Sequence, residues 1–353
     1  MSEVGRIVSA SKWRNRILFS SILILLMIAF VADVAIGSVN IPFAELTKIL
    51  FGKTSGHESW NTIVFDFRLP RAITAVLAGA ALAVSGLQMQ SLFRNPIAGP
   101  YLLGVSSGAS LGVALLILAT GSLTFFKDFI GNEGWGMIIA AITGSSLVLL
   151  LMLFISTRVN DITTILIIGM MFGSVVSAIV GILEYYSDND SLKAFTIWSF
   201  GSLSGVVWKQ LHVLIPSLII GFVVAFIMIK PLNLLLLGEN YAKSTGLNLM
   251  RTRILLIIST GILAGGITAF CGPIGFIGTA VPHINRIIFK TTDHRLLVPA
   301  SLISGALLVL ICDIVAQLPK DQVSLPINAI TALIGAPIVI WIILSRRGAK
   351  SFF

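Results

Sequence analysis

Long apolar stretches, separated by short polar segments, follow one another along almost the whole chain. Most of them hold about 20 residues, the length that an α-helix needs to cross the hydrocarbon core of a membrane. The pattern therefore predicts an all-α polytopic membrane protein of about ten transmembrane helices. The expected spans are 17–37, 71–90, 100–120, 135–156, 162–185, 208–230, 253–270, 275–290, 296–317 and 326–345.

The first apolar run follows a basic N-terminal segment, as the apolar core of a secretory signal peptide does. It extends from Ile17 to Gly37, which is longer than the roughly 7–15 residues of such a core. The small residues of a signal-peptidase cleavage site do not follow it. We therefore expect an uncleaved first transmembrane helix.

Composition supports a membrane protein. Charged residues make up 11% of the 353 positions, against about 25% in an ordinary soluble domain. The hydrophobic share is 56%, and a soluble fold with so few charges would not cover its surface. The same composition excludes a disordered chain, a coiled coil and a secreted disulfide scaffold. We expect residues 1–353 to form one transmembrane domain in contact with lipid.

The formal net charge of +9 comes from basic residues that lie singly between apolar runs. This distribution sets the orientation of a membrane protein and gives no indication of nucleic-acid binding. With ten spans and both termini in the cytoplasm, about two thirds of the 24 basic residues fall on the inner side. We therefore expect a multi-pass protein of the bacterial inner membrane with cytoplasmic termini.

The longest expected inner loop covers about residues 230–253 and combines apolar with charged positions. This pattern predicts two short helices broken at Gly246, one of them amphipathic and lying at the membrane surface. Such a helix is either a docking surface for a cytoplasmic protein or an interfacial segment without a partner. Its candidate contact residues are Gly238, Glu239, Tyr241, Lys243, Gly246 and Asn248.

Two inner turns are candidates for a gate. Residues 94–100 contain two prolines and a glycine between long apolar helices, and irregular backbone at membrane depth is tolerated inside protein or beside a water-filled path. The alternative is a plain cytoplasmic turn. Asp161 precedes the fifth span, followed by Thr163 and Thr164; these residues cap that helix or, alternatively, belong to a gate.

Charged residues also occur where the membrane makes them costly. Arg68 and Arg71 flank a Leu-Pro pair at the outer start of the second span. They are either interfacial anchors or recognise carboxylates of an external partner, for which the arginine fork is suited. Asp313 lies within the ninth span and Asp33 near the outer end of the first. A buried aspartate there faces the bundle interior, where it is paired or relays protons.

The chain carries no signature of covalent or metal chemistry. Gly52-Lys53-Thr54 lacks the glycine that a P-loop has five positions before its Gly-Lys pair, since Thr47 stands there. Cys271 and Cys312 lie in apolar runs and are expected to be small core residues. We expect no metal site and no cofactor bound by this chain.

Several segments resemble the vitamin B12 and iron-chelate ABC importer permeases. The similar segments are RLPRAITAVLAGAALAVSGLQMQSLFRNPIAGPYLLGVSSGASLG at 68–112, GENYAKSTGLN at 238–248, CGPIGFIGTAVPHINRIIFKTTDHRLLVPAS at 271–301, CDIVAQ at 312–317 and LPINAITALIGAPIVIW at 325–341. The resemblance implies the architecture of a type II ABC importer permease. It also implies a homodimer, two cytoplasmic ATP-binding subunits that hold ATP and Mg²⁺, and a periplasmic substrate-binding protein.

The resemblance also assigns roles to residues. Arg68 and Arg71 match positions that meet acidic residues of the binding protein. Asn95 and Ile97 match the turn that narrows the inner mouth, and Ile162 and Thr163 match a second constriction. Glu239 to Asn248 match the loop that faces the ATPase.

Two departures affect the outer docking surface. Some relatives have an arginine where Gln317 stands, and Lys320 is a candidate substitute; the family often has a glutamate where Ser324 stands. The sequence thus predicts a permease for a ferric siderophore, haem or a cobalamin, without naming the chelate. The alternative is a secondary transporter driven by protons or another ion through Asp313.

Overall fold

The computed structural model describes residues 3–37, 39–50, 57–119, 135–159, 161–319 and 324–344. Throughout these ranges the regular structure is helical. The first half comprises α1 (Glu3–Ala35), α2 (Phe43–Leu50), α3 (Glu58–Thr62), the π-helical η1 (Ile63–Arg68), α4 (Leu69–Leu92), η2 (Pro100–Leu103), α5 (Val105–Ala114), η3 (Leu115–Ala119), α7 (Trp135–Arg158) and α8 (Ile162–Tyr186). The second half comprises α9 (Asn189–Ser199), α10 (Trp208–Ile227), α11 (Ile229–Leu236), α12 (Glu239–Ser244), α13 (Leu249–Thr260), the π-helical η4 (Gly261–Gly265), α14 (Gly266–Cys271), α15 (Ile277–Phe289), α16 (His294–Gln317) and α17 (Ile327–Leu344).

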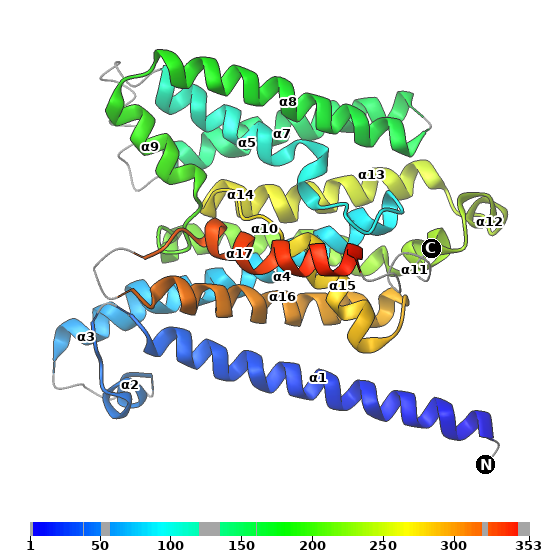
Figure 1. Cartoon of the computed structure of the whole chain (residues 1–353), viewed down its shortest axis with the longest axis horizontal. Coiled ribbons are helices and arrows are strands. Elements are labelled where there is room, and N and C mark those ends of the chain that lie inside the picture. Colours follow the sequence, from blue (N-terminus) through cyan, green and yellow to red (C-terminus); the bar gives the residue numbers. More distant parts are fainter. Residues whose placement is uncertain are drawn as a thin grey trace.

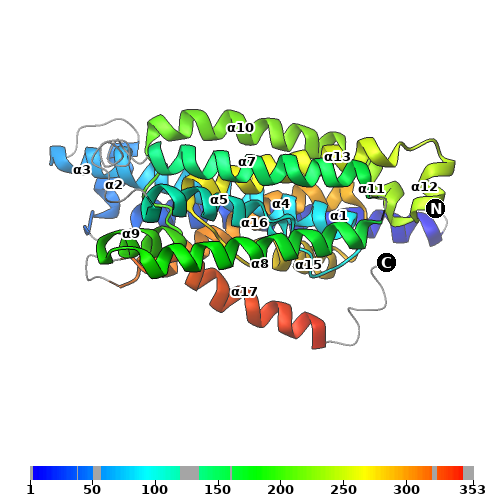
Figure 2. The same ribbon diagram turned by 90° about the horizontal axis from the view of Figure 1, so that it is seen from above.

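The long helices lie side by side along one axis, with α4 in the middle of the bundle (Figures 1 and 2). The most apolar window of the helix ending at Leu92 is 83% buried, whereas that of α1 is 17% and that of α8 is 22% buried. The peripheral helices therefore leave Leu, Ile, Met and Phe side chains exposed. An apolar exterior around a well-packed interior is the arrangement that a lipid environment favours.

Each of the ten expected spans overlaps a helical segment in the part of the chain that the structure describes. In the described part of the chain, seven helices are long and apolar enough to cross a membrane, and two shorter apolar ones cover Val105–Ala119 and Ile327–Trp341. The remaining expected span, 275–290, is the 13-residue α15, which at about 1.5 Å per residue is shorter than the hydrocarbon core. The all-helical membrane architecture predicted from the sequence is confirmed.

The seventh and eighth spans are separate helices joined by a short irregular segment. α14 ends at Cys271, and Gly272 then adopts φ +72°, a conformation that glycine accepts without strain. Phe276 also has a positive φ of 67° just before α15. Tyr101 holds the segment in place, since its hydroxyl donates to the carbonyl oxygen of Ile274 at 2.8 Å.

Two glycine pairs bring α4 against its neighbours at backbone distance. A Cβ atom added at Gly79 would overlap the carbonyl group of Gly305 in α16, and one added at Gly86 would overlap that of Gly278 in α15. Small residues at such crossings let helices pack closely where no hydrophobic effect drives association. These contacts fix α4 as the central helix of the bundle.

We expect Gly86→Ala to prevent accumulation of folded protein, because the added methyl group meets backbone, which cannot rotate away. Overpacking of a membrane-protein interior costs about 1–3 kcal/mol or more. Size-exclusion profiles of a fluorescent fusion would measure the folded yield. Gly266→Ala is the matched control, since its nearest neighbouring atom would lie at 3.6 Å. A Gly86→Ala profile equal to the wild-type profile would contradict the close α4–α15 contact.

Candidate functional site

The predicted site residues gather at the two ends of the bundle (Figures 1 and 2). The α12 end carries α11, α12, the turn at 94–99 and the start of α8; the α3 end carries α2, α3 and α9. α1 begins and α17 ends on the side of the α12 end. The expected placement of both termini on one side agrees with this arrangement, and their cytoplasmic location stays a prediction.

The turn after α4 is ordered by its own polar groups. Arg94 has a positive φ of 47°, which lets the chain reverse after Phe93. The Asn95 side-chain oxygen accepts from the backbone N–H of Ile97 at 3.1 Å. Ile97 is 50% exposed. Asn95 therefore stabilises a turn on which the apolar side chain of Ile97 is exposed. The role of Asn95 and Ile97 in a gate stays a prediction.

Asp161 caps α8, as one of the two sequence interpretations proposed. Its carboxylate accepts from the backbone N–H of Thr164 at 2.8 Å and from the Thr164 hydroxyl at 2.6 Å. The hydroxyl contact is the main reason that the pKa of Asp161 lies below its ordinary value, followed by the backbone contact. Ile162 is half-buried and Thr163 is exposed. Whether these two residues form a constriction stays a prediction.

The expected inner loop contains two short helices, α11 and α12. The break between them is at Gly238, with φ +110°, whereas Gly246, with φ +86°, ends α12 before α13. The prediction that the two short helices are separated at Gly246 was therefore wrong: Gly238 separates them, and Gly246 follows the second one. Both glycines can adopt a positive φ, so the sequence alone does not distinguish the two positions. Asn248 caps α13 by accepting from the Arg251 N–H at 3.0 Å.

α12 is amphipathic. Its Ala242 is fully buried, while Tyr241 is 53% exposed and Lys243 points to the exposed side. Glu239 stands in its first turn. The helix is therefore anchored through one small residue and offers an aromatic and charged face, which suits a groove in a protein partner.

One apolar cluster joins the three predicted elements of the α12 end to one another and to the end of α4. It unites side chains from the end of α4, from the 94–99 turn, from the start of α8 and from α11–α12. Packed interiors transmit displacement because they contain few voids. The members from these elements are Met89, Leu92, Phe93, Ala98, Ile162, Ile165, Leu232, Leu235 and Ala242.

At the α3 end, Arg68 is buried and bonded within the chain. It is 7% exposed, and its guanidinium donates to the carbonyl oxygens of Val34 at 3.0 Å and Ala35 at 2.8 Å. A third bond goes to the carbonyl oxygen of Val39. The first two contacts satisfy C-terminal carbonyls of α1. Arg68 is therefore held inside the chain and is not the interfacial anchor that one sequence interpretation expected, and its docking role stays a prediction.

Arg71 forms a two-pronged ion pair with Asp313. Its Nε and Nη2 atoms donate to the two carboxylate oxygens, both at 2.8 Å. Gln317 adds a hydrogen bond to Asp313 at 3.0 Å and one to Asp33 at 2.9 Å through the same nitrogen. Asp313 is 1% exposed and Asp33 is 2% exposed. Asp313 therefore faces the bundle interior and is paired.

A cavity of about 310 Å³ opens beside this ion pair. Arg71 and Asp313 line it together with Phe200–Leu203 and Ser324–Ile327. Arg71 thus combines its ion pair with Asp313 with a place in the wall of the cavity. Lys320, the candidate substitute for a docking arginine, lies outside the described residues, as does the 51–56 segment.

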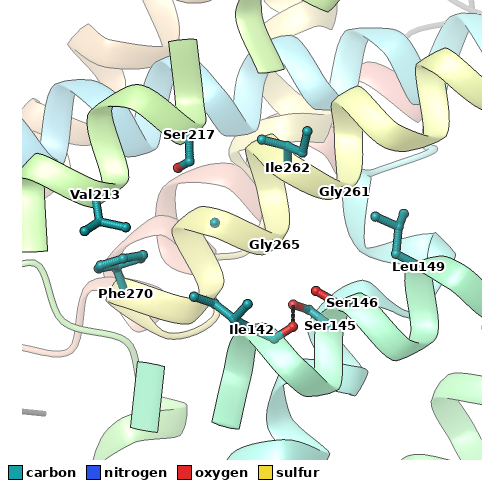
Figure 3. Close-up of a pocket in the computed structure, with 11 residues that line it drawn as sticks. Ile142, Ser145, Ser146, Leu149, Val213, Ser217, Gly261, Ile262, Gly265 and Phe270 are labelled. Atoms are coloured by element: carbon teal, nitrogen blue, oxygen red, sulfur yellow. Dashed lines mark hydrogen bonds between the residues drawn. The ribbon is translucent and has the colours of Figure 1, made fainter. Parts of the chain in front are cut away.

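A second cavity, of about 200 Å³, lies between α7, α10 and the η4–α14 segment (Figure 3). Its walls combine apolar side chains with Ser145, Ser146 and Ser217. The hydroxyl of Ser145 donates to the carbonyl oxygen of Ile142, and that of Ser217 to Leu214, so both are satisfied within their own helices. None of the predicted site residues lines this cavity.

The structure also brings together polar residues that the sequence did not single out. Ser91, Asn233, Asp293 and His294 form a connected hydrogen-bonded group at the α12 end. Gln317, noted only as a departure from the family, bridges the two carboxylates of the α3 end. The two cysteines, Cys271 and Cys312, are free and buried, as expected.

Comparisons with known proteins find similarity to membrane transport proteins. The model of the FecCD transport family matches residues 25–345. The chain is 39% identical over 282 residues to the vitamin B12 import system permease protein BtuC of Salmonella typhi, covering 80% of this chain and 83% of that protein. It is 39% identical over 286 residues to BtuC of Klebsiella pneumoniae, covering 81% and 83%.

A solved structure is also similar. An inward-facing metal-chelate type ABC transporter superposes with a TM-score of 0.79 at 30% identity. The match covers 92% of this chain and 97% of that one. The similarity therefore extends over the fold as a whole and is not confined to single motifs.

Proposed function

The chain belongs to the FecCD transport family, and from this premise we propose that it moves a metal chelate across the inner membrane by ATP-driven alternating access. As in its relatives, the chain is the permease of an ABC importer. The observation that carries the proposal is the contact between α11–α12 and the turn at 94–99, because it links a docking surface to a candidate gate. It consists of the apolar cluster of the α12 end and a hydrogen bond from the Arg94 Nη2 atom to the carbonyl oxygen of Leu235 at 2.9 Å.

The proposed partners are a second copy of the chain, two cytoplasmic ATP-binding subunits and a periplasmic binding protein. The ATPases hold ATP and Mg²⁺ and dock on residues 238–248, mainly on the exposed face of α12. The binding protein docks at the α3 end, where Arg71 lines a cavity. In the homodimer the translocation path runs along the two-fold axis.

In this mechanism the chain itself does no covalent chemistry. Closure of the ATPase pair displaces α12, and the displacement passes through the packed α12 end to Asn95, Ile97, Ile162 and Thr163. Outward opening and inward closure are then two packings of the same helices. Binding free energy that differs between the two states shifts their populations.

The alternative is an ion-coupled secondary transporter that uses Asp313. A proton carrier must change its protonation state during the cycle. Both carboxylate oxygens of Asp313 accept hydrogen bonds from Arg71 inside the bundle, which supports an anchoring role for this carboxylate. We therefore favour the ABC importer.

The substrate class is a cobalamin, haem or a ferric siderophore. We expect proteoliposomes that contain the complete complex to accumulate one of these labelled chelates when its binding protein is present outside. An amino acid and a simple sugar serve as negative controls with the same complex. Uptake of a control solute in place of every chelate would contradict the proposed substrate class.

A further inference from the structure

A chain of side-chain hydrogen bonds connects α11, the start of α16 and the end of α4. The Asn233 amide donates to the Asp293 carboxylate at 2.6 Å, and its oxygen lies 2.8 Å from the His294 ring Nδ1. The other ring nitrogen, Nε2, lies 2.7 Å from the Ser91 hydroxyl. We call Ser91, Asn233, Asp293 and His294 the coupling bridge.

The direction of each bond follows from the partners at the two ends. The backbone N–H of His294 donates to the Asn233 oxygen at 2.8 Å, and a carboxylate can only accept, so the orientation of the Asn233 amide is fixed. The His294 Nδ1 must then carry the hydrogen. In the neutral imidazole Nε2 is then an acceptor. The single hydrogen of the Ser91 hydroxyl has two acceptors in reach, His294 Nε2 at 2.7 Å and the carbonyl oxygen of Leu87 at 2.9 Å.

The two residues of the coupling bridge nearest to α4, Ser91 and His294, lie in the protein interior. His294 is 1% exposed and Ser91 is 3% exposed. A serine, a histidine and an amide in this order resemble a nucleophilic triad, but a substrate does not reach a hydroxyl so deeply buried. Buried polar groups of this kind are costly to leave unpaired. The bridge therefore holds its three elements in one arrangement.

A second, independent bond links α11 to the turn that follows α4. The Arg94 Nη2 atom donates to the carbonyl oxygen of Leu235 at 2.9 Å. α11 is thus fastened to the last turn of α4 at Ser91, through His294, and to the residue two positions after α4. A shift of α11 must move the start of the 94–97 turn or break both connections.

We propose that Asn233 and His294 are positioning residues that carry the displacement of α12 to the gate turn at 94–97. The inference rests on the proposed function, in which ATPase subunits drive α12. Asn233 lies in α11, six positions before Glu239, so it receives that movement through one short helix. His294 passes it to α4 because its ring contacts both Asn233 and Ser91.

The test uses the reconstituted complex of the full chain with its ATPase and binding protein. We expect Asn233→Ala and His294→Ala to keep ATPase binding and hydrolysis, while chelate transported per ATP falls about tenfold, as loss of a typical coupling free energy predicts. Asn285→Ala is the matched control. It removes a buried amide that bonds Ser304 at 2.8 Å and leaves α11 untouched.

A second readout reports the gate directly. An introduced Ile97→Cys is the reactive thiol to label, since Cys271 and Cys312 are buried. ATP should change its labelling rate in the parent and in Asn285→Ala, and the change should be lost in Asn233→Ala. Ser91→Ala, which deletes one hydroxyl, carries the same test if Asn233→Ala does not accumulate.

The outcomes separate this inference from the proposed function. Unchanged transport per ATP and an unchanged labelling response in the variants would overturn the coupling bridge. A wild-type chain that fails to bind any ATPase, or takes up chelate without one, would instead overturn the proposed function.

Discussion

Deleting residues 238–248 is expected to abolish co-purification of the chain with its ATPase, and Glu239→Arg is expected to weaken it strongly. The deletion removes α12, whose Tyr241 and Lys243 form the exposed face. Loss of one interface hot spot costs about 2 kcal/mol or more, roughly a thirtyfold drop in affinity. The ratio of ATPase to permease after affinity purification measures the effect.

Glu239→Arg needs a control for charge reversal as such. Asp190→Arg provides it, because Asp190 is exposed on α9 at the α3 end. The control should retain the wild-type ratio of ATPase to permease. If both the deletion and Glu239→Arg retain it as well, the ATPase docks elsewhere and α12 is an interfacial helix without a partner.

Arg71→Gln is expected to lower the affinity of the binding protein about tenfold or more at low ionic strength. The substitution removes the positive charge that lines the cavity at the α3 end. A smaller difference is expected at high salt, since salt screens the charge. Binding of the labelled protein to permease in nanodiscs, measured over a salt series, gives both quantities.

The loss of Arg71 also leaves the buried Asp313 without its cation, which is expected to lower the stability of the folded protein. The double variant Arg71→Gln with Asp313→Asn removes both charges and separates the two effects. It should recover folded yield without recovering affinity. Lys193→Gln, at an exposed position on α9, is the control for loss of one positive charge. Wild-type affinity in Arg71→Gln would leave Arg71 as a structural anchor.

The helices were predictable because their signal is local. An apolar run of membrane length needs only its own residues to be recognised, and each expected span overlaps a helical segment among the described residues. The position of Asp313 in the bundle interior was also predictable, because a charged side chain that faces lipid is costly. Its partner was not, because Arg71 stands 242 positions away.

At both ends of the bundle, polar side chains form hydrogen bonds with residues that are far away in the sequence. Gln317 reaches Asp33 across 284 positions, and His294 reaches Asn233 across 61. A single sequence carries no record of which polar side chain meets which. Arg68 was interpreted from its place in a motif, whereas its burial follows from carbonyls that the end of α1 leaves unpaired.

The central claim is that this chain is a permease powered from outside itself, through α12. Uptake of the labelled chelate into proteoliposomes tests it most directly, with the purified chain, its ATPase and its binding protein present singly and together. The account predicts uptake only when all three and ATP are present, with no uptake driven by a pH gradient alone. Uptake by the chain alone under a pH gradient, abolished in Asp313→Asn, would contradict it.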